Sequence, residues 1–117
     1  MLRTSARMNT ALVNMVFSSG KKVSGTYTML AYKKEGLVPR FSFSTSKKVA
    51  PTSVLRHRLR RVGYAVVEQI QKTYSINPGL YCFVFKINKG VSICSITPDV
   101  TGLLEKSGSL SKKTNII

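Results

Sequence analysis

Residues 46–61 hold the densest group of side chains that could bind a ligand. Six of these sixteen positions are Lys or Arg, one more is the only His, and none is acidic. The cationic and titratable members are Lys47, Lys48, Arg56, His57, Arg58, Arg60 and Arg61. Guanidinium and ammonium groups bind phosphate through charge-assisted hydrogen bonds. The group therefore predicts a polyanionic partner, and nucleic acid is the first candidate.

The whole chain is strongly basic. Its 117 residues include 19 Lys or Arg and only 4 Asp or Glu, which gives a formal net charge of +15. Like charge opposes compaction, whereas release of counterions from phosphates explains why such an excess is useful. An apolar fraction of 43% is typical of a globular domain. We expect one RNA-binding domain over residues 1–107, with 1–8 as candidates for disorder, and a flexible C-terminal tail over 108–117.

The acidic residues are too few and too scattered for a nuclease site of the usual kind. They are Glu35, Glu68, Asp99 and Glu105. A metal-dependent nuclease gathers several carboxylates around its ions. We therefore expect no catalytic residue and no metal site in this chain.

The two cysteines, Cys82 and Cys94, lie among apolar residues twelve positions apart. We expect two buried free thiols in a reducing cytoplasm, with a disulfide or a zinc pair as the alternative. One His and two Cys cannot form a standard set of four zinc ligands. No apolar run approaches the roughly 20 residues of a membrane span. Residues 1–34 contain no acid and faintly resemble a targeting peptide, but we expect them to belong to the folded domain.

An amphipathic helix over residues 53–72 would position most of the basic group. Pro51 breaks the preceding chain, and Thr52 or Ser53 can cap the helix. Five apolar residues fall within an arc of about 80°, with most cations roughly opposite: Leu55, Leu59, Val62, Val66 and Ile70. Gly63 costs about 1 kcal/mol relative to Ala inside a helix, so the helix bends or packs tightly there.

The remaining pattern predicts a single α+β domain of order α-β-β-α-β-α. Helices are expected over 9–18 and 98–106, the latter capped by Thr97 with Pro98 at its first position. Strands are expected over 26–33, 40–46 and 80–88, the last in a central position, with a further short strand near 91–96. In the strand over 40–46, Phe41, Phe43 and Thr45 would face the core.

The arginines lie at the end of the helix that disfavours them. Cations in a first turn oppose the helix dipole by about 0.3–1 kcal/mol each, and like charges four residues apart add to this. A bound phosphate would reverse both effects, because it would meet free backbone N–H groups and Arg side chains together. A solvated charged face is the alternative, but it would normally interleave acids.

Together these segments resemble the protein subunit of bacterial ribonuclease P. That family has a Ser-Lys-Lys strand end, a short link, and a helix that begins Arg-Asn-Arg and continues with basic residues. Here Ser46-Lys47-Lys48 precedes Arg56-His57-Arg58-Leu59-Arg60-Arg61. Val16-Phe17-Ser18-Ser19-Gly20 is similar to the Val-Phe-x-x-Gly that ends the family's first helix, and Gly79 and Lys89-Gly90 also fit. The resemblance covers roughly residues 9–106.

The resemblance implies a small α/β sandwich with a ferredoxin-like sheet and a left-handed βαβ crossover that contains the basic motif. It implies two partners, the catalytic RNA of ribonuclease P and precursor tRNA, from which the complex removes the 5′ leader. Cleavage and its Mg²⁺ ions would belong to the RNA. The protein alone would bind no cofactor and would require no protein partner or membrane.

By position, the resemblance assigns contacts with the catalytic RNA to the basic group defined above. It assigns a cleft for the leader to Val13, Phe17, Tyr32 and Arg40. Phe17 would stack on an unpaired base, although a core position is an equal alternative for this ring. The chain departs from the family at His57, where Asn is usual, at Val13, where an aromatic ring is common, and at Gly63-Tyr64, where Tyr64 replaces a frequent Arg.

Three other functions compete with this interpretation. A ribosomal protein or another small RNA-binding or DNA-binding module would explain the charge and the helix, but not the combined motifs. An independent nuclease would need acids that the chain lacks. A peripheral membrane protein is disfavoured because the basic helix has no Trp and its apolar arc is typical of a core.

Overall fold

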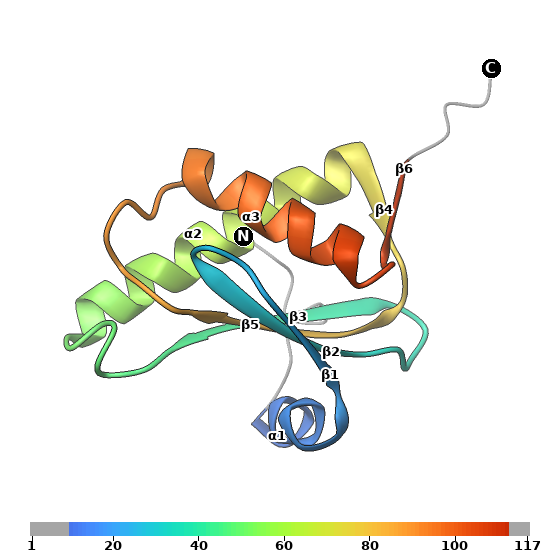
Figure 1. Cartoon of the computed structure of the whole chain (residues 1–117), viewed down its shortest axis with the longest axis horizontal. Helices are drawn as coiled ribbons and strands as arrows, with labels where there is room; N and C mark the ends of the chain where they lie inside the picture. Colours follow the sequence, from blue (N-terminus) through green and yellow to red (C-terminus); the bar gives the residue numbers. More distant parts are fainter. Residues whose placement is uncertain (1–9, 113–117) are drawn as a thin grey trace.

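A mixed four-stranded sheet organises the molecule, and helices cover both of its faces (Figure 1). The computed structural model describes residues 10–112. In chain order its elements are α1 (Thr10–Ser19), β1 (Lys21–Ser24), β2 (Thr28–Lys33), β3 (Pro39–Thr45), α2 (Ser53–Thr73), β4 (Tyr74–Ile76), β5 (Gly79–Phe85), α3 (Ile93–Lys106) and β6 (Leu110–Lys112). The sheet order is β1-β2-β5-β3, with β3 parallel to β5 and the other pairs antiparallel. Since α2 lies between the parallel strands in sequence, it forms a crossover, and the predicted α+β class is confirmed.

The main core lies between the sheet and the pair α2 and α3. Because side chains alternate along a strand, every second residue of β2, β3 and β5 faces these helices. The buried strand residues on this side are Leu30, Phe41, Phe43, Tyr81, Phe83 and Phe85. Their helical partners are Leu59, Val66, Val67, Ile70, Ile96, Val100, Leu103 and Leu104. Phe43 stacks on Phe83 with ring centroids 4.8 Å apart.

The opposite face of the sheet carries a smaller core under α1. Val16 of α1 is fully buried against Ala31, Leu80 and Cys82. Half-buried apolar residues of α1 surround this contact: Leu12, Val13, Met15 and Phe17. Figure 1 shows α1 on this side of the sheet, opposite α2 and α3, and its apolar side chains hold it against the strands.

Most of the predicted elements are confirmed within two residues. Strand β5 ends at Phe85, three residues before the predicted end at 88, and the short strands β1 and β4 are not predicted from the sequence. The predicted cap of α2 is also present, since the Thr52 side chain accepts a hydrogen bond from Leu55 N at 3.2 Å. Gly63 packs tightly, as one of its two predicted alternatives required, because a Cβ there would collide with the Phe43 ring.

The C-terminal third departs from the prediction. Helix α3 begins at Ile93, because Ser92 and Ser95 form a reciprocal cap one and a half turns before Thr97. The predicted strand near 91–96 and the predicted cap at Thr97 are therefore wrong, and Pro98 lies inside the helix.

The expected tail over 108–117 is also partly wrong. Ser109 is buried, its carbonyl accepts from Asn77 N at 2.8 Å, and β6 pairs with β4. Residues 113–117 and the expected disorder over 1–8 lie outside the described residues. Neither cysteine forms a disulfide, but Cys94 is exposed, so the expectation of two buried thiols holds only for Cys82. Over residues 10–112, no helix is long and apolar enough to cross a membrane.

Candidate nucleic-acid interface

The first two turns of α2 present cations to solvent. His57, Arg58 and Arg61 are exposed, Arg56 and Arg60 are half-buried, and the first turn holds no acid. The opposite side of the helix is anchored by Leu59, Val66 and Ile70 in the main core. Because this buried stripe fixes the helix in rotation, the predicted separation of apolar and cationic faces is realised.

A tight turn between β3 and α2 exposes Lys47 and Lys48. Ala50 N donates to the Ser46 carbonyl at 2.9 Å, and Val49 N donates to Ser46 Oγ at 3.3 Å. Asn88 Nδ2 donates to the Val49 carbonyl from the far side. Ala50 itself is fully buried. The turn is therefore held by its backbone and by Asn88, which leaves both lysine side chains exposed.

Arg56 and Arg60 have local partners that distinguish them from the other arginines. Arg56 Nη1 donates to the Ala50 carbonyl at 2.9 Å, and its Nη2 donates to Ser53 Oγ at 3.1 Å. Arg60 Nη2 lies 3.1 Å from His57 Nδ1. Since Arg can only donate, His57 accepts through Nδ1 in this contact. Arg56 thus holds the turn that carries the lysines, and His57 orients Arg60.

Two further lysines join this group across the sheet. β3 and β5 are parallel, and Thr45 is paired with Phe85. The segments that follow the two strands therefore meet at the same end of the sheet. There Lys48, Lys86 and Lys89 line a shared hollow. Lys86 Nζ donates to Ser24 Oγ and to the Gly25 carbonyl, each at 2.8 Å. Sequence reasoning missed these lysines, because finding them required the pairing of β3 with β5.

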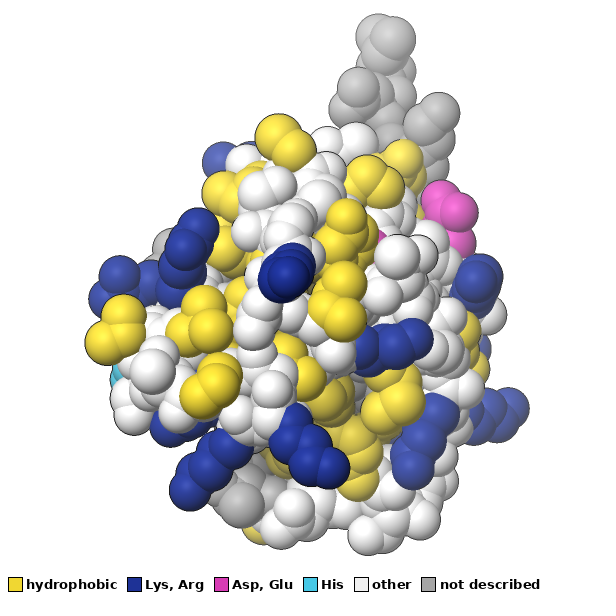
Figure 2. All heavy atoms as spheres, turned by 60° about the vertical axis from the view of Figure 1, so that its left-hand side comes forward, with side chains coloured by type: hydrophobic (Ala, Val, Ile, Leu, Met, Phe, Trp, Pro, Cys, Tyr) yellow, Lys and Arg dark blue, Asp and Glu magenta, His cyan; other side chains and the backbone are white. Residues whose placement is uncertain are grey.

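We call this surface the basic end. Its members are the seven predicted residues and two that the structure adds: Lys47, Lys48, Arg56, His57, Arg58, Arg60, Arg61, Lys86 and Lys89. Figure 2 shows one side of the molecule on which Lys and Arg side chains surround apolar ones, while acidic side chains appear mainly at one margin. A polyanion approaching this side meets little repulsion.

Three of the four residues predicted for the leader lie on the α1 side of the sheet, and one does not. Val13 and Phe17 are half-buried on α1. Arg40 alternates with buried Phe41 and lines a hollow with Leu12 and Leu80. Tyr32 instead packs against the main core on the opposite face, and Ala31 takes the α1 side in β2. A shift of one residue along a strand exchanges the faces, which explains this miss.

The acidic residues of the described chain are engaged elsewhere and do not converge. Both carboxylate oxygens of Asp99 accept hydrogen bonds from the β1–β2 turn, including Thr26 N at 2.8 Å and Thr28 N at 3.0 Å. Glu35 lies 3.5 Å from Lys33 Nζ. Over residues 10–112, no group of three or more His, Cys, Asp or Glu side chains could hold a metal ion. What the described residues present is a set of cationic donors suited to phosphate at one end of the sheet and one half-buried aromatic ring, Phe17, on α1.

Comparisons with known proteins agree with the motifs. A family model described as Ribonuclease P matches residues 7–107. The ribonuclease P protein component of Syntrophomonas wolfei subsp. wolfei (strain DSM 2245B / Goettingen) is 28% identical over 122 residues, which cover 100% of this chain and 99% of the relative. Two solved structures share the fold. The RNase P protein of Staphylococcus aureus at 2.0 Å has a TM-score of 0.74 and 18% identity, covering 89% of this chain and 96% of that one. The RNase P protein of Thermotoga maritima has a TM-score of 0.70 and 14% identity, covering 80% and 89%.

Proposed function

Since the chain belongs to the ribonuclease P protein family, we propose that it binds the catalytic RNA of ribonuclease P and the 5′ leader of precursor tRNA. In this role it assists removal of the leader, while the RNA carries out the cleavage. The observation that supports this most is the basic end, where nine cationic or titratable side chains from α2 and the edges of β3 and β5 gather.

The catalytic RNA is the partner proposed for α2. Its exposed Arg58 and Arg61 line one hollow with His57, and Arg56 and Arg60 line another beside Ser44 and Thr45. A phosphate in the first of these hollows, which Val54 also lines, would lie near the start of α2 and its backbone N–H groups. A negative ligand there would remove the unfavourable contact between these cations and the helix dipole.

The leader is the partner proposed for the α1 side of the sheet. Phe17 and Val13 border it from α1, and Arg40, Ser42 and Ser44 project from β3 on the same side. An aromatic side chain with polar and cationic neighbours suits a single strand, because bases stack while the backbone is neutralised. Val13 offers no ring, so Phe17 would provide the main stacking surface.

Catalysis is proposed to reside in the RNA, with Mg²⁺ bound through the RNA and not by this chain. The dispersed acids of the described residues support this division. We further propose a cytoplasmic complex that needs no second protein.

The decisive experiment measures cleavage of precursor tRNA by the cognate catalytic RNA at low Mg²⁺, with and without the protein. We expect strong stimulation by the protein and no cleavage by the protein alone. Arg58→Ala with Arg61→Ala should weaken RNA binding and flatten its salt dependence by about two contacts. These two arginines make no hydrogen bond or ion pair within the described residues, so the fold should persist. Lack of stimulation, combined with tight binding to unrelated structured RNA, would favour a ribosomal or general RNA-binding role.

A further inference from the structure

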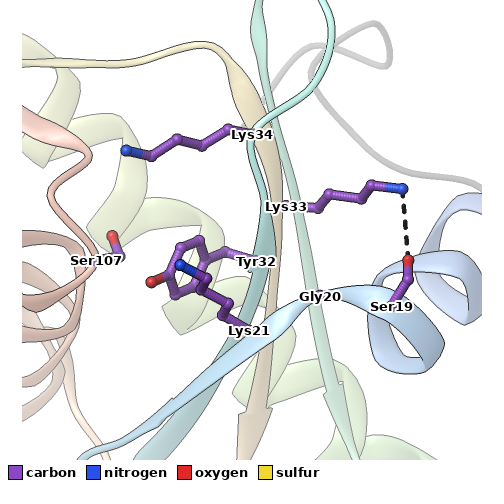
Figure 3. Close-up of a pocket in the computed structure, with 7 residues that line it drawn as sticks. All are labelled: Ser19, Gly20, Lys21, Tyr32, Lys33, Lys34 and Ser107. Atoms are coloured by element: carbon purple, nitrogen blue, oxygen red, sulfur yellow. Dashed lines mark hydrogen bonds between the residues drawn. The ribbon is translucent and has the colours of Figure 1, made fainter.

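A second cationic site lies at the end of the sheet opposite the basic end. Lys21 begins β1, Lys34 follows β2, and Tyr32 lies between them around a hollow of about 320 Å³. Ser107, just after α3, lines the other side of the hollow. Figure 3 shows the ends of Lys21, Tyr32 and Lys34 extending toward the side of Ser107, whereas Lys33 runs the other way to Ser19.

The strands fix the positions of these groups. Lys21 and Tyr32 are directly paired in the β1–β2 ladder, so their side chains leave the sheet on the same face. Tyr32 packs against the main core, which restrains its ring. Gly20 N donates to the Val16 carbonyl at 2.7 Å, which ties the start of β1 to the end of α1. The site is therefore built on regular elements rather than on a loose loop.

No acidic side chain of the described residues neutralises its two lysines. Neither Lys21 nor Lys34 has an ion pair among residues 10–112, and Glu35 pairs with Lys33. The Tyr32 hydroxyl has no hydrogen-bond partner in this part of the chain. Ser107 Oγ donates to the Leu104 carbonyl and lies 2.9 Å from Ser109 Oγ, so it serves as a wall of the hollow. Two ammonium groups and a phenol thus face the hollow as hydrogen-bond donors.

We propose that this pocket binds a phosphate of the RNA backbone, at a second contact separate from the basic end; the inference rests on the proposed function. Two ammonium groups and a hydroxyl donor suit a phosphodiester, and the volume admits a nucleotide. β5 is seven residues long, so the two sites stand about 20 Å apart along the strands. A folded RNA can reach both, and the protein then fixes the relative position of two of its segments.

A structural explanation competes with this one. Lys21 and Lys34 lie near the C-terminal end of α3, where cations favour the helix dipole. In that case, replacing the two lysines would lower the stability of the protein and leave its RNA binding unchanged. The test therefore needs both readouts.

The test compares Lys21→Gln/Lys34→Gln with Lys72→Gln/Lys106→Gln, which removes the same charge from exposed positions on α2 and α3 that do not line the pocket. Binding to the cognate catalytic RNA is measured across a salt series, and thermal unfolding is measured alongside. We expect the pocket variant to reduce the slope of log K against log salt by about two, and the control by much less. Equal slopes for both variants, or a lowered unfolding midpoint with an unchanged slope, would overturn the proposal.

A crosslinking experiment keeps the proposal separate from the proposed function. A photoreactive group is attached to Lys34→Cys in a Cys94→Ser background, with Arg58→Cys in the same background as the positive control. We expect both to crosslink to the RNA, at different segments. Crosslinking from position 58 alone rejects only the second contact, whereas no binding by the unmodified protein rejects both proposals.

Discussion

The two faces of the sheet are built differently. The face toward α2 and α3 is closed by sixteen buried apolar residues, including the stacked rings of Phe43 and Phe83, whereas four such residues, one of them in α1, form the contact between the other face and α1. Burial of apolar area is the main source of stability, so most of it comes from the first face. The second face retains polar and cationic strand residues such as Arg40 and Ser42. The domain thus concentrates stability on one side and keeps the other available for a ligand.

The contact between Gly63 and Phe43 gives the sharpest test of the closed face, by which we mean the face of the sheet toward α2 and α3. Gly63→Ala should destabilise the protein by up to about 3 kcal/mol, because the added methyl group collides with a ring that is itself stacked on Phe83. The matched control is Gly102→Ala in α3, where the added Cβ has nothing within 4 Å. That change should stabilise by about 0.5–1 kcal/mol through helix propensity. Chemical denaturation measures both changes, and a neutral Gly63→Ala would show that this face is less tightly packed than it looks.

Asp99 joins the β1–β2 turn to α3 at the margin of the closed face. Its carboxylate accepts from the backbone N–H groups of Thr26, Tyr27 and Thr28 and from the Thr28 hydroxyl. Thr28 is fully buried, so Asp99→Ala should leave donors without acceptors and cost about 2 kcal/mol. Glu105→Ala, an exposed change on the same helix, should alter the free energy of unfolding by less than about 0.5 kcal/mol. If the two substitutions lowered the free energy of unfolding by similar amounts, the hydrogen bonds of Asp99 would not contribute to stability as proposed.

These residues also show what the sequence could and could not predict. The arc of Leu55, Leu59 and Val66 predicted α2 and its cationic face because helical periodicity is a local property. The role of Asp99 depends on contacts more than 70 positions away, such as Thr28 Oγ1 at 2.8 Å, so no local pattern reports it. β4 and β6 are three residues each and stabilise one another only as a pair. Tyr32 was placed on the wrong face because a strand's register is set by its neighbours.

Phe17 tests the function proposed for the open face, which is the face of the sheet on the side of α1. Phe17→Ala should weaken the leader-dependent part of precursor-tRNA binding by about 1 kcal/mol, the lower end of what base stacking contributes, since Val13 has no ring to share the base. The measurement compares affinity of the holoenzyme for precursor tRNA with and without a leader. Met15→Ala, in the same half-buried group on α1, serves as a control for loosening of the helix. An equal loss for both substrates would mean that Phe17 is a core residue and nothing more.

The smallest expected change in stability concerns the two cysteines. Their thiols also report how easily α1 separates from the sheet. Burial raises the pKa of Cys82 to about 12, while Cys94 is exposed. Cys94→Ser should therefore change stability by less than about 0.5 kcal/mol and leave Cys82 as the one thiol to follow.

In that variant, alkylation of Cys82 at pH 8 requires α1 to leave the sheet. Because the buried cluster on this side has four members, against sixteen on the side of α2 and α3, this opening should cost less free energy than global unfolding. Labelling of Cys82 should then stay measurable at denaturant concentrations where the aromatic core remains folded. If the labelling rate instead follows global unfolding at every denaturant concentration, the two faces unfold as one cooperative unit. The α1 side would then differ from the other face in its surface residues and not in its stability.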